Sequence, residues 1–484
     1  MSIESVKGII ENIQEDKEYF DVSIIGGGAS GTACAALLSS WGLKVILIEK
    51  RGHLGGRAST LGSNFGYMID TGVHGIPYYD LGSLKGIEKE LDLEFELIDY
   101  NPLLVFYDAA EELCVEVSNF SNEGLKEVNR IWSPNGEFMR LINYLRNVNN
   151  KKASELDRIS VKNFIQRYSP THQFYQLIRA INGMITIEPH LGSAGEFIRS
   201  FSKLFSSKRP ITYPKHGGIQ YLSEELGDIC VKNDGKILLY TEAKQILLEK
   251  GRVIGINCEY NYKKETKIEF KIESKSIINT IPLQFLFEII DRKNFSDRFS
   301  KKINSLKDKQ SCAQGIAFSF KEELLKDFPW DPKCWGAIVF QPGKKPRYLS
   351  VPSALVPDLS PEGKHFMFYG IVVTPEEIKD RKLSRKRIKE LKSEIFQLLP
   401  NLKDLKEWQF DGSSEMVLGT SKRVGMTGDY KPKNKSEDIE GLFFAGDTAS
   451  GNGPGLECTF DSAYKCSKIV FNWIKKEYDK KQIN

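Results

Sequence analysis

The chain has 484 residues, with 68 lysines and arginines against 64 acidic residues and a formal net charge of +4. That length suggests about two or three domains, and the near balance of charge, without a concentrated basic run, argues against nucleic acid as the main partner. The eight cysteines are scattered without a C-x-x-C pair. This favours free thiols in a reducing compartment and excludes an enzyme that relays electrons through a disulfide.

The sequence shows no pattern typical of a metal site, a signal peptide or a membrane span. The six histidines show no H-x-x-x-H or Cys/His spacing, so no metal site is indicated. Residues 1–20 predict a charged leader helix and do not resemble a signal peptide, and the longest apolar runs, such as Phe366–Val373, are too short to span a bilayer. We therefore expect a cytoplasmic protein, with peripheral contact to a membrane as an open alternative.

The stretch Asp21–Lys50 predicts a strand, a glycine turn, a helix and a second strand. Its turn, from Gly26 to Gly31 through Ala29 and Ser30, has the spacing G-x-G-x-x-G. Gly26 would allow the tight turn, Gly28 would let the backbone approach a pyrophosphate, and Gly31 would let the helix lie close to the strand. An ordinary strand–helix turn is the alternative, but the context favours a dinucleotide site.

An acidic residue follows at the spacing that this site requires. Glu49 ends the second strand, directly before Lys50, about 20 residues past the glycines, where a carboxylate can bind a ribose diol. A second glycine pair with an arginine, Gly55-Gly56-Arg57, comes next. A guanidinium beside glycines is a good diphosphate clamp.

With these residues the sequence resembles the FAD-binding amine oxidase and phytoene desaturase superfamily. The resemblance implies a Rossmann-like FAD-binding domain of the glutathione reductase type, an α/β fold, with an interleaved α+β substrate domain containing an antiparallel sheet. It also implies that Gly55, Gly56 and Arg57 lie along the FAD pyrophosphate.

Further landmarks of the superfamily follow in order. Asp70-Thr71-Gly72 resembles its D-x-G segment near the flavin, and His74 lies just beyond it. His74 could touch substrate or flavin, although a histidine satisfied by backbone is the simpler interpretation. Tyr213–Gly218 resembles the Pro-x-G-G turn with one extra residue, and the resemblance implies that Ala243 offers its backbone to the adenine.

The closing segment, Gly441–Cys466, holds the last signature. A strand delivers Gly446-Asp447, and a glycine-rich loop opens the final helix. The resemblance implies that Asp447 accepts hydrogen bonds from the ribityl and pyrophosphate side of FAD, and that the amides of Gly455 and Leu456 point at the flavin C2 carbonyl.

Two insertions explain the length. Helices are expected in the first, including Glu155–Tyr168 as one helix. Four strands near residues 314–320, 334–341, 347–351 and 365–373 and a single helix Pro375–Leu399 are expected in the second. The expected domain plan is a leader at 1–20, FAD-binding parts at 21–118, 211–285 and 431–484, and substrate-domain parts at 119–210 and 286–430.

We predict an FAD-dependent oxidoreductase, closer to the carotenoid desaturase, isomerase and retinol saturase branch because Leu456-Glu457-Cys458 departs from the amine oxidase pattern. Hydride would pass between a C–H bond of a hydrophobic, isoprenoid or polyene-like substrate and flavin N5, and electrons would leave to oxygen, a quinone or a separate reductase. No catalytic acid or base is assigned; His74 is the one candidate. A flavin amine oxidase or protoporphyrinogen oxidase-like enzyme, and a non-catalytic prenyl-binding protein of the GDP-dissociation inhibitor type, stay open as alternatives.

One helix raises a question about membranes. In Glu196–Arg209, an aromatic face is flanked by basic residues; its apolar members are Phe197, Ile198, Phe201, Leu204 and Phe205. Such a helix can lie in a membrane interface and collect a lipophilic substrate. The alternative is that this face packs into the core of the substrate domain.

Overall fold

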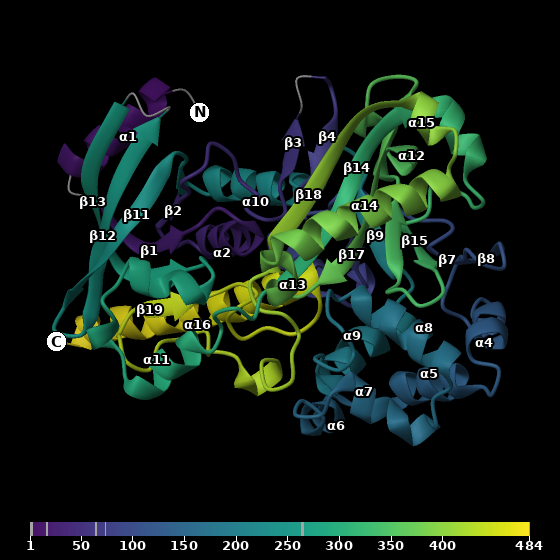
Figure 1. The fold of residues 1–484 in the computed structure, drawn as a ribbon. Helices are drawn as coiled ribbons and strands as arrows, with labels where there is room; N and C mark the ends of the chain where they lie inside the picture. Colours follow the sequence, from purple (N-terminus) through teal and green to yellow (C-terminus); the bar gives the residue numbers. More distant parts are fainter. Residues whose placement is uncertain (1–2, 16–17, 63–64, 73, 263–265, 484) are drawn as a thin grey trace.

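The computed structural model describes residues 3–15, 18–62, 65–72, 74–262 and 266–483. Within these ranges the chain forms two seven-stranded sheets and a block of helices, which lie in different parts of the molecule (Figure 1). The α/β class and the antiparallel sheet expected from the sequence are both confirmed.

The first sheet carries the glycine turns. Its strands are β1 (Tyr19–Ile25), β2 (Val45–Ile48), β10 (Lys236–Leu238), β11 (Thr241–Glu249), β12 (Arg252–Tyr262), β13 (Thr266–Asn279) and β19 (Leu442–Phe444). The order is β10-β2-β1-β13-β12-β11, with β19 also on β13. β1, β2, β10 and β19 pair in parallel, whereas β11 and β12 are antiparallel. The apolar residues of β1 are buried, as strands covered on both faces require.

Helices cover both faces of this sheet. On one face α2 (Ala29–Ser40), α10 (Tyr221–Lys232) and α16 (Gly455–Ile483) pack together, with α3 (Ser83–Leu91) against α16. The leader helix α1 (Ile3–Glu15) buries Val6, Ile10 and Ile13 in a different core cluster, against residues of β1 and β2. Helix α1 therefore covers apolar residues of the sheet to which the central glycine turn belongs.

The second sheet has the order β18-β14-β17-β16-β15-β7-β8. Its strands are β7 (Leu104–Asp108), β8 (Leu113–Val117), β14 (Ser311–Lys321), β15 (Gly336–Phe340), β16 (Arg347–Ser350), β17 (Lys364–Val373) and β18 (Lys406–Leu418). All neighbours are antiparallel except β15 and β7. The four strands expected in the second insertion are present. β18 was not expected, because its half-exposed residues lack a strong alternation and its pairing with β14 is far from local.

Shorter strands and helices lie between these elements in the chain. They are β3 (Thr60–Gly62), β4 (Met68–Asp70), β5 (Ile76–Pro77), β6 (Leu97–Asp99), β9 (Ile211–Pro214), α11 (Asp297–Asn304), α12 (Pro352–Leu355) and α15 (Leu402–Leu405). β3 pairs with β4, and β9 lies between β5 and β6.

The single helix expected over Pro375–Leu399 is wrong. The segment forms α13 (Pro375–Lys379) and α14 (Arg381–Leu398), separated at Asp380. The Asp380 carboxylate accepts hydrogen bonds from the backbone N–H groups of Lys382 and Leu383. This N-cap starts a new helix at a position where the amino-acid composition by itself predicts one continuous helix.

The helical block contains α4 (Lys126–Trp132), α5 (Glu137–Asn147), α6 (Asn150–Glu155), α7 (Val161–Ile165), α8 (His172–Gly183) and α9 (Ala194–Ser206). The single helix expected over Glu155–Tyr168 is wrong. The chain breaks after α6, and Ser160 caps α7 by accepting from the N–H of Asn163. The turn between them places Asp157 inside the protein, where it pairs with Arg199 of α9.

Helix α9 settles the question of its aromatic face. Phe197, Ile198 and Phe201 are each 1% exposed, and Leu204 and Phe205 are also buried, so the core interpretation is correct. The interfacial interpretation of this helix is wrong, because it leaves no apolar face for a bilayer. Across the described ranges, no helix has both the length and the apolar character needed to cross a membrane.

Candidate functional site

The two glycine turns lie against each other at the carboxyl ends of β1 and β2. The backbone N–H of Gly55 donates to the carbonyl of Gly27 at 2.9 Å, and Gly28 forms a bridge with Gly55. A Cβ on Gly31 would lie 1.9 Å from the carbonyl oxygen of Gly26, so only glycine lets α2 approach β1 this closely. The result is a surface made of backbone, without side-chain bulk.

The start of α2 offers unsatisfied donors to this surface. Gly28 is the N-cap and supplies no side chain to cap the first turn, in which Ala29 and Ser30 are buried. The N–H groups of a first helical turn lack intrahelical acceptors, and the helix dipole favours negative charge there. A Cβ on Gly28 would meet its nearest atom, the Cα of Gly56, only at 3.7 Å. The site therefore has both the donors and the access that a pyrophosphate needs.

Glu49 stands directly beside the first turn. Its carboxylate accepts hydrogen bonds from the N–H of Gly27 at 2.7 Å and from the N–H of Arg51 at 2.8 Å, and the residue is buried. Lys50, the next residue, is exposed. The acid is thus held at the glycine turn, where a ribose diol next to a pyrophosphate would lie.

Arg57 and Asp447 join the second glycine turn to the end of β19. The guanidinium donates twice to the carboxylate, at 2.7 and 2.8 Å, and the N–H of Gly419 donates to it at 2.7 Å. Burial alone raises the pKa of Asp447, but the Arg57 charge and these hydrogen bonds hold it well below its usual range. Gly446 brings this end of β19 next to α2, since its Cβ would lie 3.3 Å from the Oγ of Ser30.

The remaining predicted cofactor residues lie in two places. Gly455 begins α16 and Leu456, in its first turn, is buried. Ala243 is buried in β11, opposite Cys258, at a point where the register with β12 shifts before Gln245. Such an irregularity leaves backbone groups outside the ladder, as an adenine contact through backbone would require.

The aspartate of the D-x-G segment, Asp70, is held by three hydrogen bonds. Asp70 accepts hydrogen bonds from the hydroxyls of Thr60 and Tyr213 and from the N–H of Ile219. Burial raises its pKa. It fastens the β3–β4 hairpin to the turn after β9, so its role is to position the neighbouring segment.

His74 lies against an aromatic wall. Its ring stacks on Phe368 with centroids 4.9 Å apart, and its buried Nδ1 has no hydrogen-bond partner among the described residues. Burial lowers the pKa of its imidazole, although Asp70 opposes that shift. Stacked on Phe368, the His74 ring presents a flat contact surface in this place.

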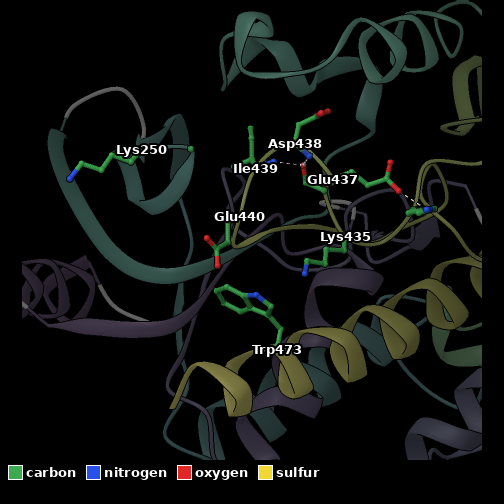
Figure 2. A pocket seen from close by; sticks show the side chains of 10 residues that line it. Lys250, Lys435, Glu437, Asp438, Ile439, Glu440 and Trp473 are labelled. Carbon is green, nitrogen blue, oxygen red and sulfur yellow. Dashed lines mark hydrogen bonds and ion pairs between the residues drawn. The ribbon is translucent and has the colours of Figure 1, made fainter. Parts of the chain in front are cut away.

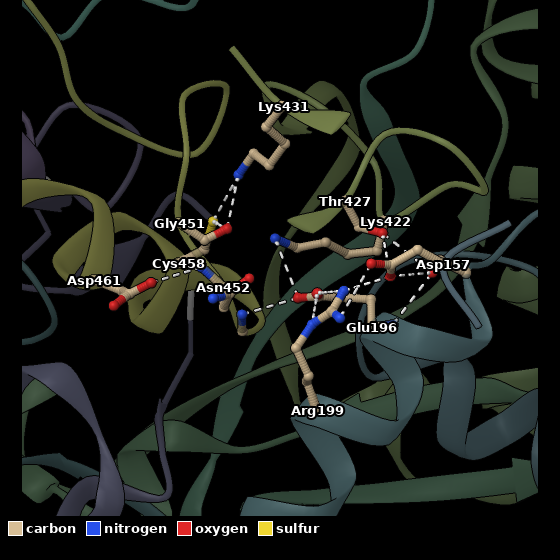
Figure 3. A network of polar contacts seen from close by, with 12 residues as sticks. Asp157, Glu196, Arg199, Lys422, Thr427, Lys431, Gly451, Asn452, Cys458 and Asp461 are labelled. Carbon is tan, nitrogen blue, oxygen red and sulfur yellow. Dashed lines mark hydrogen bonds and ion pairs between the residues drawn. The ribbon is translucent and has the colours of Figure 1, made fainter. Parts of the chain in front are cut away.

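A buried polar network beside α16 carried no signal in the sequence (Figure 3). Arg199 binds Asp157 and Glu196, and Glu196 accepts from the N–H of Gly453 at 2.9 Å. Lys422 lies 3.8 Å from Glu196. No pattern in the sequence indicated that these residues would meet, so only the fold brings them together.

The hollow shown in Figure 2 is a different place. Its volume is about 790 Å³, and exposed charged side chains such as Lys250, Lys435 and Glu440 line it, with Trp473. None of the predicted site residues lines this hollow, and it holds no convergent set of donors. We assign it no role.

The fold and the site together define a dinucleotide-binding flavoprotein: a parallel sheet with two glycine turns, an acid after β2 and a Gly-Asp after β19. The chain belongs to the flavin containing amine oxidoreductase family, whose model matches residues 29–467. It is an FAD-dependent oxidoreductase. The non-catalytic prenyl-binding alternative is therefore set aside.

Individual relatives differ in how much of the chain they match. A phytoene desaturase of Phycomyces blakesleeanus is 22% identical over 88% of this chain and 81% of its own length. The flavin-containing amine oxidase A of Sus scrofa is 28% identical over 37% of this chain and 34% of its own length. A solved oxidoreductase from Methanosarcina mazei has the same fold, with a TM-score of 0.70, 18% identity, and coverage of 93% of this chain and 100% of that one.

Proposed function

We propose that this oxidoreductase moves a hydride between a C–H bond of a hydrophobic, isoprenoid or polyene-like substrate and flavin N5. The observation that supports the proposal is the share of this chain that each relative matches. Similarity to the phytoene desaturase extends over 88% of the chain, whereas similarity to the amine oxidase covers 37%. Because function depends on the particular site and not on the fold, a relative that matches most of the chain is the more informative.

The cofactor residues take the following roles in this proposal. The first turn of α2, Gly55, Gly56 and Arg57 hold the pyrophosphate, and Glu49 binds the adenosine ribose. Ala243 contacts the adenine through its backbone. Gly446 and Asp447 bind the ribityl side, and the first turn of α16 faces the flavin C2 carbonyl with the amides of Gly455 and Leu456. When bound, FAD supplies the hydride-transfer chemistry.

The substrate side is supported by a row of aromatic rings. Trp408 contacts Tyr67 at 5.3 Å between centroids, Tyr67 contacts Phe366 at 6.3 Å, and Phe366 contacts Phe368 at 5.6 Å. His74 stacks on Phe368 and extends the row toward the D-x-G segment. Flat apolar surfaces hold a conjugated or isoprenoid chain by dispersion and desolvation.

The electron acceptor and the source of substrate are part of the same proposal. Electrons pass to an external acceptor, which is oxygen, a quinone or a separate reductase. A lipophilic substrate favours contact with a membrane surface, and that contact would use surfaces other than α9, whose apolar face is buried.

The test follows the flavin's visible absorbance under anaerobic conditions. Purified holoprotein is mixed with phytoene in detergent micelles, and dithionite-reduced holoprotein is mixed with lycopene. Bleaching in the first case or recovery in the second supports the proposal, with product identified by chromatography. Benzylamine is the comparison substrate. Bleaching by benzylamine, with no exchange with either polyene, would instead assign amine oxidation.

A further inference from the structure

Lys431 is a lysine enclosed beside the start of α16. It is 4% exposed and lies in the segment between β18 and β19. Its Nζ is 3.2 Å from the carbonyl oxygen of Gly451 and 3.1 Å from the Sγ of Cys458 (Figure 3). Gly451 lies in the loop that leads into α16, and Cys458 lies in the opening turn of that helix.

No carboxylate is paired with Lys431 among the residues that the structure describes, whereas the neighbouring Lys422 faces Glu196 at 3.8 Å. Buried lysines are almost always paired, because an ammonium without a counter-charge pays a large desolvation cost. Burial lowers the pKa of Lys431 and the like charge of Lys422 adds to that effect, whereas Cys458 and Asp447 oppose it. The contacts with Gly451 and Cys458 satisfy hydrogen-bond donors of the Lys431 side chain but supply no carboxylate.

The carboxylates nearby are already used. Arg57 neutralises Asp447, and Arg199 with Lys422 accounts for Glu196 and Asp157. Lys431 is then one cation in excess, next to the N-terminus of α16, which is itself a region of positive potential. An unpaired buried cation and a helix N-terminus at one place point to an anionic group of a ligand.

We infer that Lys431 is the counter-charge for the reduced flavin, at the pyrimidine end of the ring. This rests on the proposed placement of FAD against the first turn of α16. A hydride accepted at N5 would break a substrate C–H bond, form an N5–H bond and leave one negative charge over N1 and the C2 carbonyl. The cationic substrate carbon left behind would lose a neighbouring proton to water, which forms the double bond. A fixed cation close to that charge favours the reduced form more than the oxidised form, which is how a preorganised charge aids the chemical step. Lys431 thus acts on the cofactor and not on the substrate.

Sulfite binding tests this directly, because sulfite adds at flavin N5 and, like hydride, places a negative charge on N1 and the C2 carbonyl. The dissociation constant of sulfite is measured by bleaching of the FAD-loaded protein. Lys431→Met should weaken sulfite binding by roughly tenfold or more, as expected for loss of a charged contact. Lys431→Arg, which keeps the charge, should retain most of the affinity, and the flavin reduction potential should shift in the same order.

A matched control is available in the same segment. Lys433 is exposed and pairs with Glu437 at the surface, so Lys433→Met should leave sulfite affinity and potential unchanged. Circular dichroism and the flavin-to-protein ratio verify that each variant is folded and loaded. If Lys431→Met does not fold, Lys431→Gln takes its place, since its amide can still donate to the carbonyl of Gly451.

The outcome that overturns the inference is a loaded, folded neutral variant that binds sulfite as tightly as wild type. Equal loss in Lys431→Arg and Lys431→Met would also overturn it, because charge would then not be the cause. A wild-type protein that takes up no FAD would instead refute the cofactor placement on which the proposed function depends. The two failures are therefore distinguishable.

Discussion

Arg57 and Asp447 are separated by 390 residues and form a bidentate ion pair, with Nη2–Oδ1 and Nη1–Oδ2 distances of 2.7 and 2.8 Å. The carboxylate is 4% exposed and the guanidinium side chain 37% exposed. The pair joins the second glycine turn to the end of β19, so the N-terminal and C-terminal signatures become one surface. Four consequences of this site and of the core around it can be measured.

Alanine substitutions at Gly28 and Gly31 should distinguish an effect on FAD binding from an effect on folding. Gly31→Ala forces a Cβ to 1.9 Å from a backbone oxygen, so the protein should fail to fold or lose several kcal/mol of stability, as in other overpacked sites. Gly28→Ala meets only ordinary contacts at 3.7 Å and has an ordinary φ of −76°. The apoprotein of Gly28→Ala should therefore unfold within about 1 kcal/mol of wild type but bind FAD much more weakly. Urea unfolding and equilibrium dialysis with FAD check both, and normal FAD binding by Gly28→Ala would contradict the pyrophosphate placement.

Glu49→Ala should weaken both binding and stability. Affinity for FAD should fall by roughly tenfold or more, because a charge-assisted hydrogen bond is lost. Two backbone donors, on Gly27 and Arg51, also lose their acceptor, which should cost the apoprotein about 1–3 kcal/mol. The control is Lys50→Ala, which changes an exposed neighbour. The assignment fails if flavin content at limiting FAD is the same in both variants.

Asp447→Asn should change the response of stability to acid. The folded carboxyl has a lowered pKa, so its contribution is complete above the unfolded pKa of about 4 and is lost as pH falls through the lower folded value. At neutral pH the variant should be less stable by about 2 kcal/mol, a modest figure because the arginine is partly exposed. Urea midpoints of the two apoproteins should differ by a constant amount from pH 7 to about pH 4 and converge below it. Convergence already between pH 8 and pH 5 would refute the lowered pKa.

Phe201 tests the buried face of α9. Phe201→Ala should cost about 3–5 kcal/mol, the range for truncating a buried phenylalanine. Lys208→Ala, at an exposed position just after the helix, should stay within about 0.5 kcal/mol of wild type. A Phe201→Glu, Phe205→Glu double variant should lose its cooperative unfolding transition by circular dichroism. A folded double variant that no longer floats with anionic liposomes would revive the membrane interpretation.

Local pattern was enough to recognise the family and its cofactor, because each landmark is made by neighbours in the chain. The spacing of Gly26, Gly28 and Gly31 fits only a tight turn into a helix, and Glu49 follows one strand later at a fixed distance. Strands such as β14 and β17 could be predicted for a similar reason, since their own residues are apolar and β-branched or aromatic. The assignment to an FAD-binding family follows from these short-range patterns taken in order.

Tertiary packing determined the features that the sequence pattern did not predict. The aromatic face of α9 has the same pattern whether it meets a bilayer or a core, and only its neighbours in the helical block show that it is buried. β18 owes its strand to β14, nearly a hundred residues away. The helix breaks near Asp157 and at Asp380 go with polar contacts of these side chains that composition does not reveal. Lys431 is an ordinary lysine in the sequence, and among the described residues it becomes buried without a carboxylate partner because its segment packs against the start of α16. Burial and charge pairing depend on residues distant in the chain, so tertiary structure alone determines them.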